Sequence, residues 1–210
     1  MSAANLGITY DPRTHAFRPQ PDPVTGELKV DPSIRLRAKS FGVDISLFYS
    51  TVSTATSPWG YGRSASVHGR VIGDPDVPFV FIERGDFTRF QFDKGSTVGN
   101  ITSYDTASVN GTTTLSYDSV SEEYTEYFVD GSRLIYKKQL SSGDVHELVR
   151  VTDAAGYAHT YSYGAGVEEG LLKTIQTPGG RTVSFAYQAG SGTSLVHTVE
   201  DWSGRLWTMQ

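Results

Sequence analysis

The sequence predicts an all-β protein made of antiparallel β-hairpin repeats that form an open, curved and spiralling sheet. Three observations support this fold class. The 210 residues include 22 Gly, 12 Tyr and 10 Phe but only 2 Met, a composition that favours strands joined by tight turns. Apolar and polar residues alternate with a period of two in several segments. One segment recurs every 24 residues near the end of the chain, which is typical of repeat proteins.

The composition also excludes several classes of function. The formal net charge of −5 lacks the excess of Lys and Arg that a nucleic-acid partner requires, so no nucleic acid is expected. Cysteine is absent, which excludes disulfides, thiolate metal sites and Cys nucleophiles. No stretch approaches the roughly 18 apolar residues of a membrane helix, so no membrane span is expected. Residues 1–7 show neither a basic segment nor an apolar core, and no signal peptide is visible.

Three regions are expected along the chain. Residues 1–32 form a Pro-rich lead-in with few apolar residues, because proline blocks the hydrogen bonds of a β-ladder. One short edge strand is predicted within it, at residues 26–30. Residues 33–147 form an N-terminal β-sheet region, and residues 148–210 hold the repeats of period 24.

Alternation defines the strands of the middle region. Residues 42–50 carry apolar side chains at every second position, the period of a strand with one buried face. Further strands are expected at residues 65–72, 78–84, 87–93 and from 112 onwards. Ser, Thr, Asn and Gly weaken the pattern over residues 95–111. The clearest hairpin signal is at Asp130 and Gly131, because this dipeptide accepts positive φ at both turn positions.

The repeated segments align without gaps around three glycines. Each segment begins with a β-branched residue that closes a strand, passes through a short turn to Gly, and returns as an alternating strand. One face of the returning strand is bulky and the other is mostly small and polar. The positions expected to be structural are Gly156, Gly180 and Gly204 in the turns, and Tyr161, Phe185, Met209, Tyr163 and Tyr187 on the bulky face.

The bulky face has a direct consequence for stability. A lone hairpin is marginal in water, so stacked hairpins are expected to complete one another along this face. We interpret its aromatic row as core packing, with a platform for carbohydrate or peptide as the alternative. The last strand would leave an uncapped edge that invites pairing with more chain. The chain is therefore expected to be the N-terminal part of a longer polypeptide or a truncated reading frame.

No residue pattern indicates a catalytic, cofactor-binding or metal site. The five histidines are dispersed and form no pair at metal-binding spacing. They are His15, His68, His146, His159 and His197. Two glutamate groups, 122–126 and 168–169, lie near turns and are interpreted as solvated, since neighbours on a strand point to opposite faces. Neither a nucleophile elbow nor a phosphate-binding glycine loop is present, so the chain is not expected to be an enzyme.

The residues that follow the repeat glycines carry a further signal. Gly180 and Gly204 are each followed by Arg, and aromatic-x-aromatic patterns come next, as at residues 185–187. These patterns resemble the rearrangement-hotspot (Rhs) and tyrosine–aspartate (YD) repeat family. The segments 47–50, 58–62 and 87–90 are similar to the region before the repeats in bacterial members. The likeness covers roughly residues 22–210.

The resemblance also has departures. The Tyr-Asp pair of the family is absent from its place, since Gly164 follows Tyr163 and Gln188 follows Tyr187. After Gly62, where the family pattern would have Trp, the chain has Arg63. The chain is thus identified as a divergent member.

The resemblance implies a long sheet that spirals into a hollow shell around a C-terminal toxin domain, which a self-cleaving Asp-based segment near the shell's end can release. It implies that this chain is a structural part of the wall, with further repeats and a passenger domain of the same polypeptide as partners. It implies export or a place on the bacterial cell surface without a visible cleaved signal peptide. No catalytic residue and no cofactor is carried over. The alternative function is a carbohydrate-binding adhesin or fibre segment that uses the aromatic face.

Overall fold

The protein is all-β in the part of the chain that the structure describes. This computed structural model describes residues 8–11, 16–19, 33–36, 42–106, 113–141, 143–188 and 194–209. They form twenty strands and one 3-10 helix, η1 (Gly166–Glu168), and every strand pair is antiparallel. The predicted all-β class and its hairpins are therefore confirmed. No helix within these ranges has the length and hydrophobicity needed to cross a membrane.

The N-terminal strands form three small sheets. One pairs β1 (Ile8–Asp11) with β2 (Ala16–Pro19), another joins β3 (Ser33–Leu36), β4 (Val43–Tyr49) and β7 (Arg63–Ala65), and the last pairs β5 (Thr56–Ser57) with β6 (Gly60–Tyr61). The edge strand predicted at residues 26–30 lies outside the described residues. In β4 the predicted alternation is present, because Val43 and Ile45 are buried while Asp44 is exposed.

Eight strands close into an antiparallel barrel. They are β8 (Gly69–Ile72), β9 (Phe79–Arg84), β10 (Arg89–Val98), β11 (Ile101–Thr106), β12 (Thr113–Asp118), β13 (Glu123–Phe128), β14 (Arg133–Lys138) and β15 (Val145–Thr152). Each pairs with the next along the chain, and β15 then pairs with β8, with His146 opposite Val71. The prediction of an open sheet is therefore wrong for these eight strands. Closure depends on the pairing of β8 with β15, which lie far apart in the chain.

Every strand of the barrel supplies an apolar or aromatic side chain to the interior. These side chains are almost fully buried and alternate with residues on the outer face. One from each strand, in chain order, is Val71, Ile82, Phe92, Tyr104, Leu115, Tyr124, Tyr136 and Leu148. Burial of each contributes about 1.5–3 kcal/mol, so the interior is a packed core.

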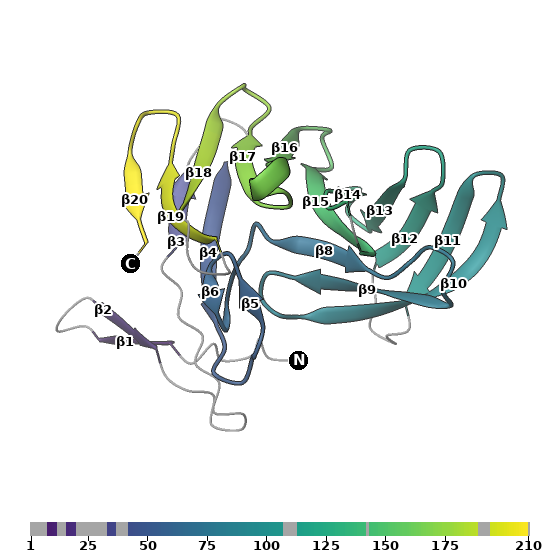
Figure 1. Ribbon diagram of the computed structural model, residues 1–210, viewed down its shortest axis with the longest axis horizontal. Helices are drawn as coiled ribbons and strands as arrows, with labels where there is room; N and C mark the ends of the chain where they lie inside the picture. The colour runs from purple at the N-terminus through teal and green to yellow at the C-terminus, as the bar shows by residue number, and fades with distance from the viewer. Residues whose placement is uncertain are drawn as a thin grey trace.

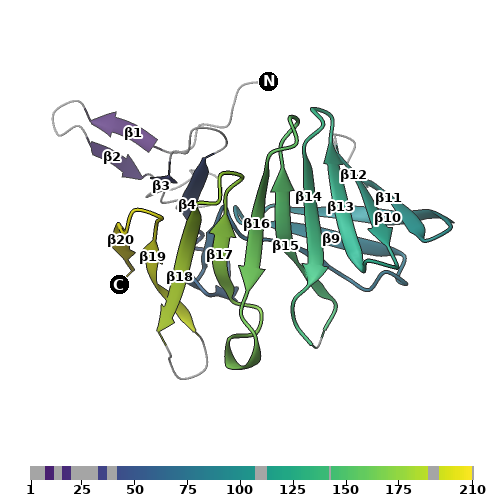
Figure 2. The ribbon, with the colours of Figure 1, turned by 90° about the horizontal axis from the view of Figure 1, so that it is seen from above.

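Five further strands continue the sheet away from the barrel. They are β16 (Ala158–Tyr163), β17 (Leu172–Gln176), β18 (Thr182–Gln188), β19 (Leu195–Glu200) and β20 (Leu206–Thr208). The strand β15 joins the two parts, because residues 145–147 pair with β8 and residues 150–152 pair with β16. The boundary predicted between residues 147 and 148 therefore falls inside β15. Figures 1 and 2 both show β16 to β20 extending in a row from one side of the barrel.

Two strand assignments differ from the sequence prediction. Residues 65–72, expected as one strand, form β7 and β8 with a turn between them, in which the His68 N–H donates to the Ala65 carbonyl. Residues 95–111, which had no clear pattern, include the end of β10 and all of β11. Val98 and Ile101, on either side of the turn between these strands, are exposed although they are apolar, so the period-two signal is lost there.

Candidate functional site: the repeated hairpins and their inner face

The three sequence repeats share one turn. In the first, the Asp153 N–H donates to the Tyr157 carbonyl at 2.9 Å and the Gly156 N–H donates to the Asp153 carbonyl at 3.0 Å. The same two bonds recur at residues 177–181 and 201–205. A three-residue loop that ends in a left-handed residue is a common way to join twisted antiparallel strands.

The turn glycines are required for their conformation. The φ angles of Gly156, Gly180 and Gly204 are 87°, 76° and 79°. A Cβ atom added at any of the three would meet no other atom within 4 Å. The constraint is therefore the positive φ expected from the sequence, which costs nothing for Gly, and not a lack of space.

Two earlier hairpins have the same turn. At residues 128–132 the glycine position is held by Gly131, with φ 87°, and at residues 84–88 it is held by Phe87, with φ 66°. The hairpin at Asp130 and Gly131 was predicted from the sequence as a two-residue turn, but its loop has three residues and only Gly131 has a positive φ. Neither hairpin was recognised from the sequence as a copy of the repeat. Gly131 lies 25 residues before Gly156, one more than the repeat period, and Phe87 lacks the glycine signature altogether.

The residue five places after each turn position lies on the inner face of its sheet. In chain order these residues are Phe92, Tyr136, Tyr161, Phe185 and Met209; the first four are buried and Met209 packs against the same core. Two of them belong to the barrel and three to the extension. One hairpin unit therefore recurs through both parts of the described chain.

Successive hairpins of the extension are offset from one another. Tyr161 lies opposite Ile175, and Ile175 lies opposite Val183. Val183 is two residues before Phe185, the counterpart of Tyr161 in the next repeat. Phe185 in turn lies opposite Val199. A shift of two residues keeps every bulky side chain on the same face, since the strand period is two.

Two tyrosines of the repeat make equivalent hydrogen bonds. The Tyr163 Oη donates to the Leu148 carbonyl at 2.8 Å, and the Tyr187 Oη donates to the Leu172 carbonyl at 2.6 Å. Both carbonyls lie 15 residues earlier in the chain. Burial raises the pKa of both hydroxyls above the ordinary value, so they remain protonated donors.

The N-terminal strands cover part of this inner face. The ring of Trp59 meets Phe185 edge-on, with centroids 6.1 Å apart, and the Val196 N–H donates to the Pro58 carbonyl at 2.7 Å. Tyr161 and Phe185 are buried, whereas Tyr157, at the rim of the turn, is 49% exposed. Tyr161 and Phe185 therefore pack in the core, whereas Tyr163, Tyr187 and Trp207 are only partly buried against it.

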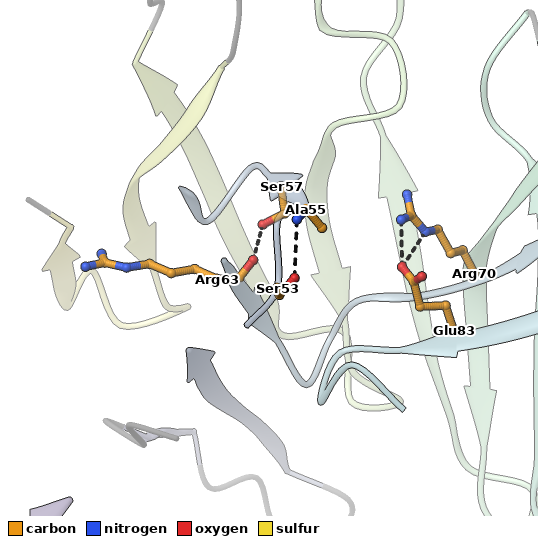
Figure 3. A network of polar contacts seen from close by, with 6 residues as sticks. All are labelled: Ser53, Ala55, Ser57, Arg63, Arg70 and Glu83. Carbon is orange, nitrogen blue, oxygen red and sulfur yellow. Dashed lines mark hydrogen bonds and ion pairs between the residues drawn. The ribbon is translucent and has the colours of Figure 1, made fainter. Parts of the chain in front are cut away.

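A polar pocket lies between the barrel and the β5–β7 segment. It has a volume of about 390 Å³ and is lined by serine hydroxyls on one side and by Arg70 and Glu83 on the other. These two residues are cross-strand partners, and the Arg70 Nε and Nη2 donate to Glu83 Oε1 at 2.9 and 2.6 Å (Figure 3). Opposite them, the Ser57 hydroxyl donates to the Arg63 carbonyl.

Two titratable groups near this pocket have shifted pKa values. Burial, with the Arg70 charge as a smaller cause, lowers the pKa of His68 to about 4, so its imidazole is neutral at pH 7. Burial raises the pKa of Glu147 to about 7, against the opposing effect of Arg70. Within the described ranges no group of three or more potential ligands could hold a metal ion.

The remaining histidines occupy unrelated places. His146 is buried inside the barrel, with burial lowering its pKa, and its ring meets Tyr124 edge-on at 4.9 Å. His159 is buried on the inner face of the extension, and His197 is exposed. His15 lies outside the described residues. The structure brings none of these together with His68 in one site among the residues it describes.

The interpretation of the glutamate groups at residues 122–126 and 168–169 as solvated is wrong at Glu126. Glu126 is 1% exposed, inside the barrel, where it accepts hydrogen bonds from Arg84 at 2.6 Å and from the Tyr136 Oη at 3.0 Å. The alternation of β13 places it on the inner face, which could not be recognised without knowledge of closure. Glu168 pairs with Lys173, and Glu169 accepts from Ser141.

The fold and the repeated hairpins define an all-β protein in which a closed barrel is continued by hairpins of one recurring design. No protein-family model matches the chain, and no curated protein matches it.

Proposed function

We propose that this chain is a structural segment of an Rhs/YD-type shell that encloses or presents a passenger domain, most simply a toxin, located elsewhere in the same polypeptide. The observation that carries the proposal is the recurring hairpin, with the same turn and an inward side chain at the same position in each copy. A unit of this kind builds a wall by addition, because each hairpin buries its bulky face only beside neighbours.

The geometry of the extension supports a wall that grows. Each hairpin keeps its large side chains on one face and is offset from the last by two residues. Such an offset, added to the natural twist of strands, favours curvature of the sheet. Within the described residues β20 pairs only with β19, so its other edge presents free backbone groups to a further strand.

The buried aromatic row also favours a structural role over a carbohydrate platform. A platform that stacks on sugars needs open aromatic faces, whereas Phe185 is 2% exposed and is met by Trp59. The proposal assigns no catalysis to the chain, and it places the chain in an exported or cell-surface bacterial polypeptide.

The native polypeptide provides the test. An antibody raised against this chain should detect a species far larger than 22.9 kDa in cells that carry the gene, and electron microscopy should show a hollow shell with separate density inside. A native product of about 23 kDa that binds glycans on an array would overturn the proposal.

A matched pair of variants tests the wall role in that polypeptide. Tyr187→Ala removes an inward side chain and its hydrogen bond to Leu172, so the enclosed domain should become sensitive to protease. Tyr157→Ala removes an exposed side chain and should leave the protection unchanged. Equal protection in both variants would contradict an enclosing function for these hairpins.

A further inference from the structure

An apolar pocket lies where β4 and β7 meet the last strands of the extension. Its volume is about 230 Å³, slightly below the usual range of about 300–1,000 Å³ for ligand pockets. The strands β4 and β7 and Trp59 form one side, and Val196 of β19 and Met209 after β20 form the other. Backbone hydrogen bonds from Val196 to Pro58 and from Met209 to His197 fix this second side.

The lining is mostly apolar, with Tyr49, Ser64 and Arg63 as its polar residues. Leu47, Phe48 and Trp59 supply the apolar surface, and Arg63 brings the single charged side chain to the lining. In Figure 3 the Arg63 guanidinium points away from the Arg70–Glu83 pair, toward the C-terminal strands. An apolar recess with one oriented charge selects a ligand with an apolar body and one group of opposite charge.

Arg63 has no acidic partner among the described residues. The ion pairs of this part of the chain use Arg70, Arg84, Arg205 and three lysines. Arg63 is exposed, and its guanidinium carbon lies 5.9 Å from the centroid of the Tyr49 ring, a contact that leaves the charge unneutralised. Its fork of N–H donors matches both oxygens of a carboxylate.

We propose that this pocket binds a small monoanionic carboxylate with an aromatic or aliphatic body, which pairs with Arg63 and packs against Leu47, Trp59, Val196 and Met209. This site is separate from the proposed wall role and does not depend on it. Because β4 and β7 form one side of the pocket and the extension forms the other, a bound ligand also stabilises the contact between these two parts.

Calorimetric titration of the intact chain tests the site with benzoate, phenylacetate, 4-phenylbutyrate and octanoate, each paired with its neutral amide. The best carboxylate should bind at least about tenfold more tightly than its amide. Arg63→Gln should abolish this difference, and Arg63→Lys should keep part of it, since Lys retains the charge but lacks the fork. Arg150→Gln, a change at an exposed arginine outside the pocket, should bind as the unaltered chain does.

Three results would overturn the proposal. They are equal affinity for carboxylate and amide, an unchanged preference in Arg63→Gln, and the absence of binding by all four carboxylates up to about 5 mM. Circular dichroism tests whether both Arg63 variants are folded. If Arg63→Gln is unfolded, the affinities of Arg63→Lys for carboxylate and amide decide the outcome.

Discussion

Glu126 illustrates at the scale of one residue how the barrel changes the environment of a charge. Its carboxylate is buried, yet both oxygens are used, one by Arg84 and the other by Tyr136. The Arg84 guanidinium is itself flanked by the rings of Phe90 and Phe128, at 5.6 and 5.4 Å. A buried carboxylate is tolerated only with such partners, because an unpaired charge would cost several kcal/mol.

Glu126→Gln should therefore lower the free energy of unfolding by about 2 kcal/mol, since it weakens two charge-assisted hydrogen bonds in the interior. The control is Glu123→Gln on the same strand, where the carboxylate pairs with Lys137 at 3.3 Å in partial contact with water. That change should cost less than about 0.5 kcal/mol. Urea denaturation measures both, and similar losses would show that Glu126 is not held as described.

Phe87 is the one bulky residue at a turn position that glycine occupies in the other four copies. A φ of 66° is strained for any residue with a Cβ, by about 1 kcal/mol. Phe87→Gly and Phe87→Ala both remove the ring, so only the backbone effect distinguishes them. We expect the Gly variant to be more stable than the Ala variant by about 1 kcal/mol in thermal denaturation. An Ala variant of equal or greater stability would rule out strain at this turn.

At the scale of the element, adjacent glycines separate conformation from space. Gly179 and Gly180 both have open space where a Cβ would lie, but only Gly180 has a positive φ. Gly180→Ala should thus destabilise the protein by about 1 kcal/mol, whereas Gly179→Ala should be neutral or slightly stabilising. Thermal melts of the two variants provide the comparison. Equal melting temperatures would mean that the turn adapts and that the repeat glycine is dispensable.

The hairpins are also the part of the fold that the sequence predicts best. The glycines at 156, 180 and 204 fix a turn that depends only on nearby residues, so their period is visible in the sequence. The turn at Phe87 was not recognised as a copy of the repeat, because a non-glycine residue adopts the positive φ there. The polar pocket was missed for another reason: its cross-strand pair, Arg70 and Glu83, has no spacing that indicates a site before β8 and β9 are placed.

At the scale of the whole molecule, closure of the barrel could not be predicted. The pairing of residues 70–72 with 145–147 joins segments about 75 residues apart, and no local pattern in the sequence indicates it. Period two predicts that a strand has a buried face but not which strands share the interior. The same pairing makes β15 a branch point, because its first half completes the barrel and its last residues begin the extension. The two parts are therefore expected to depend on each other for stability.

Glu147 lies at this branch point. The residue is 7% exposed. It lies opposite Arg70 on the neighbouring strand, and Glu83 of β9 and Tyr163 of the extension lie close enough to interact with its charge. Its pKa is raised from 4.5 to about 7, mainly by burial. Between these pH values the folded state binds more protons than the unfolded state does. The contribution of Glu147 to the free energy of unfolding is therefore fully present below pH 4.5 and is lost as the pH rises through 7.

Glu147→Gln resembles the protonated carboxyl at every pH, so it should match the unaltered chain in stability near pH 4.5 and exceed it at pH 8 by up to about 3 kcal/mol. His68 acts in the opposite direction, because its lowered pKa makes stability rise from about pH 4 to 6.5. The histidine is present in both proteins and cancels in their difference. Urea denaturation at pH 4.5, 6, 7 and 8 measures that difference. A gap that stays constant with pH would show that Glu147 is already ionised in the folded protein, and that the branch point of the sheet carries a charge at neutral pH.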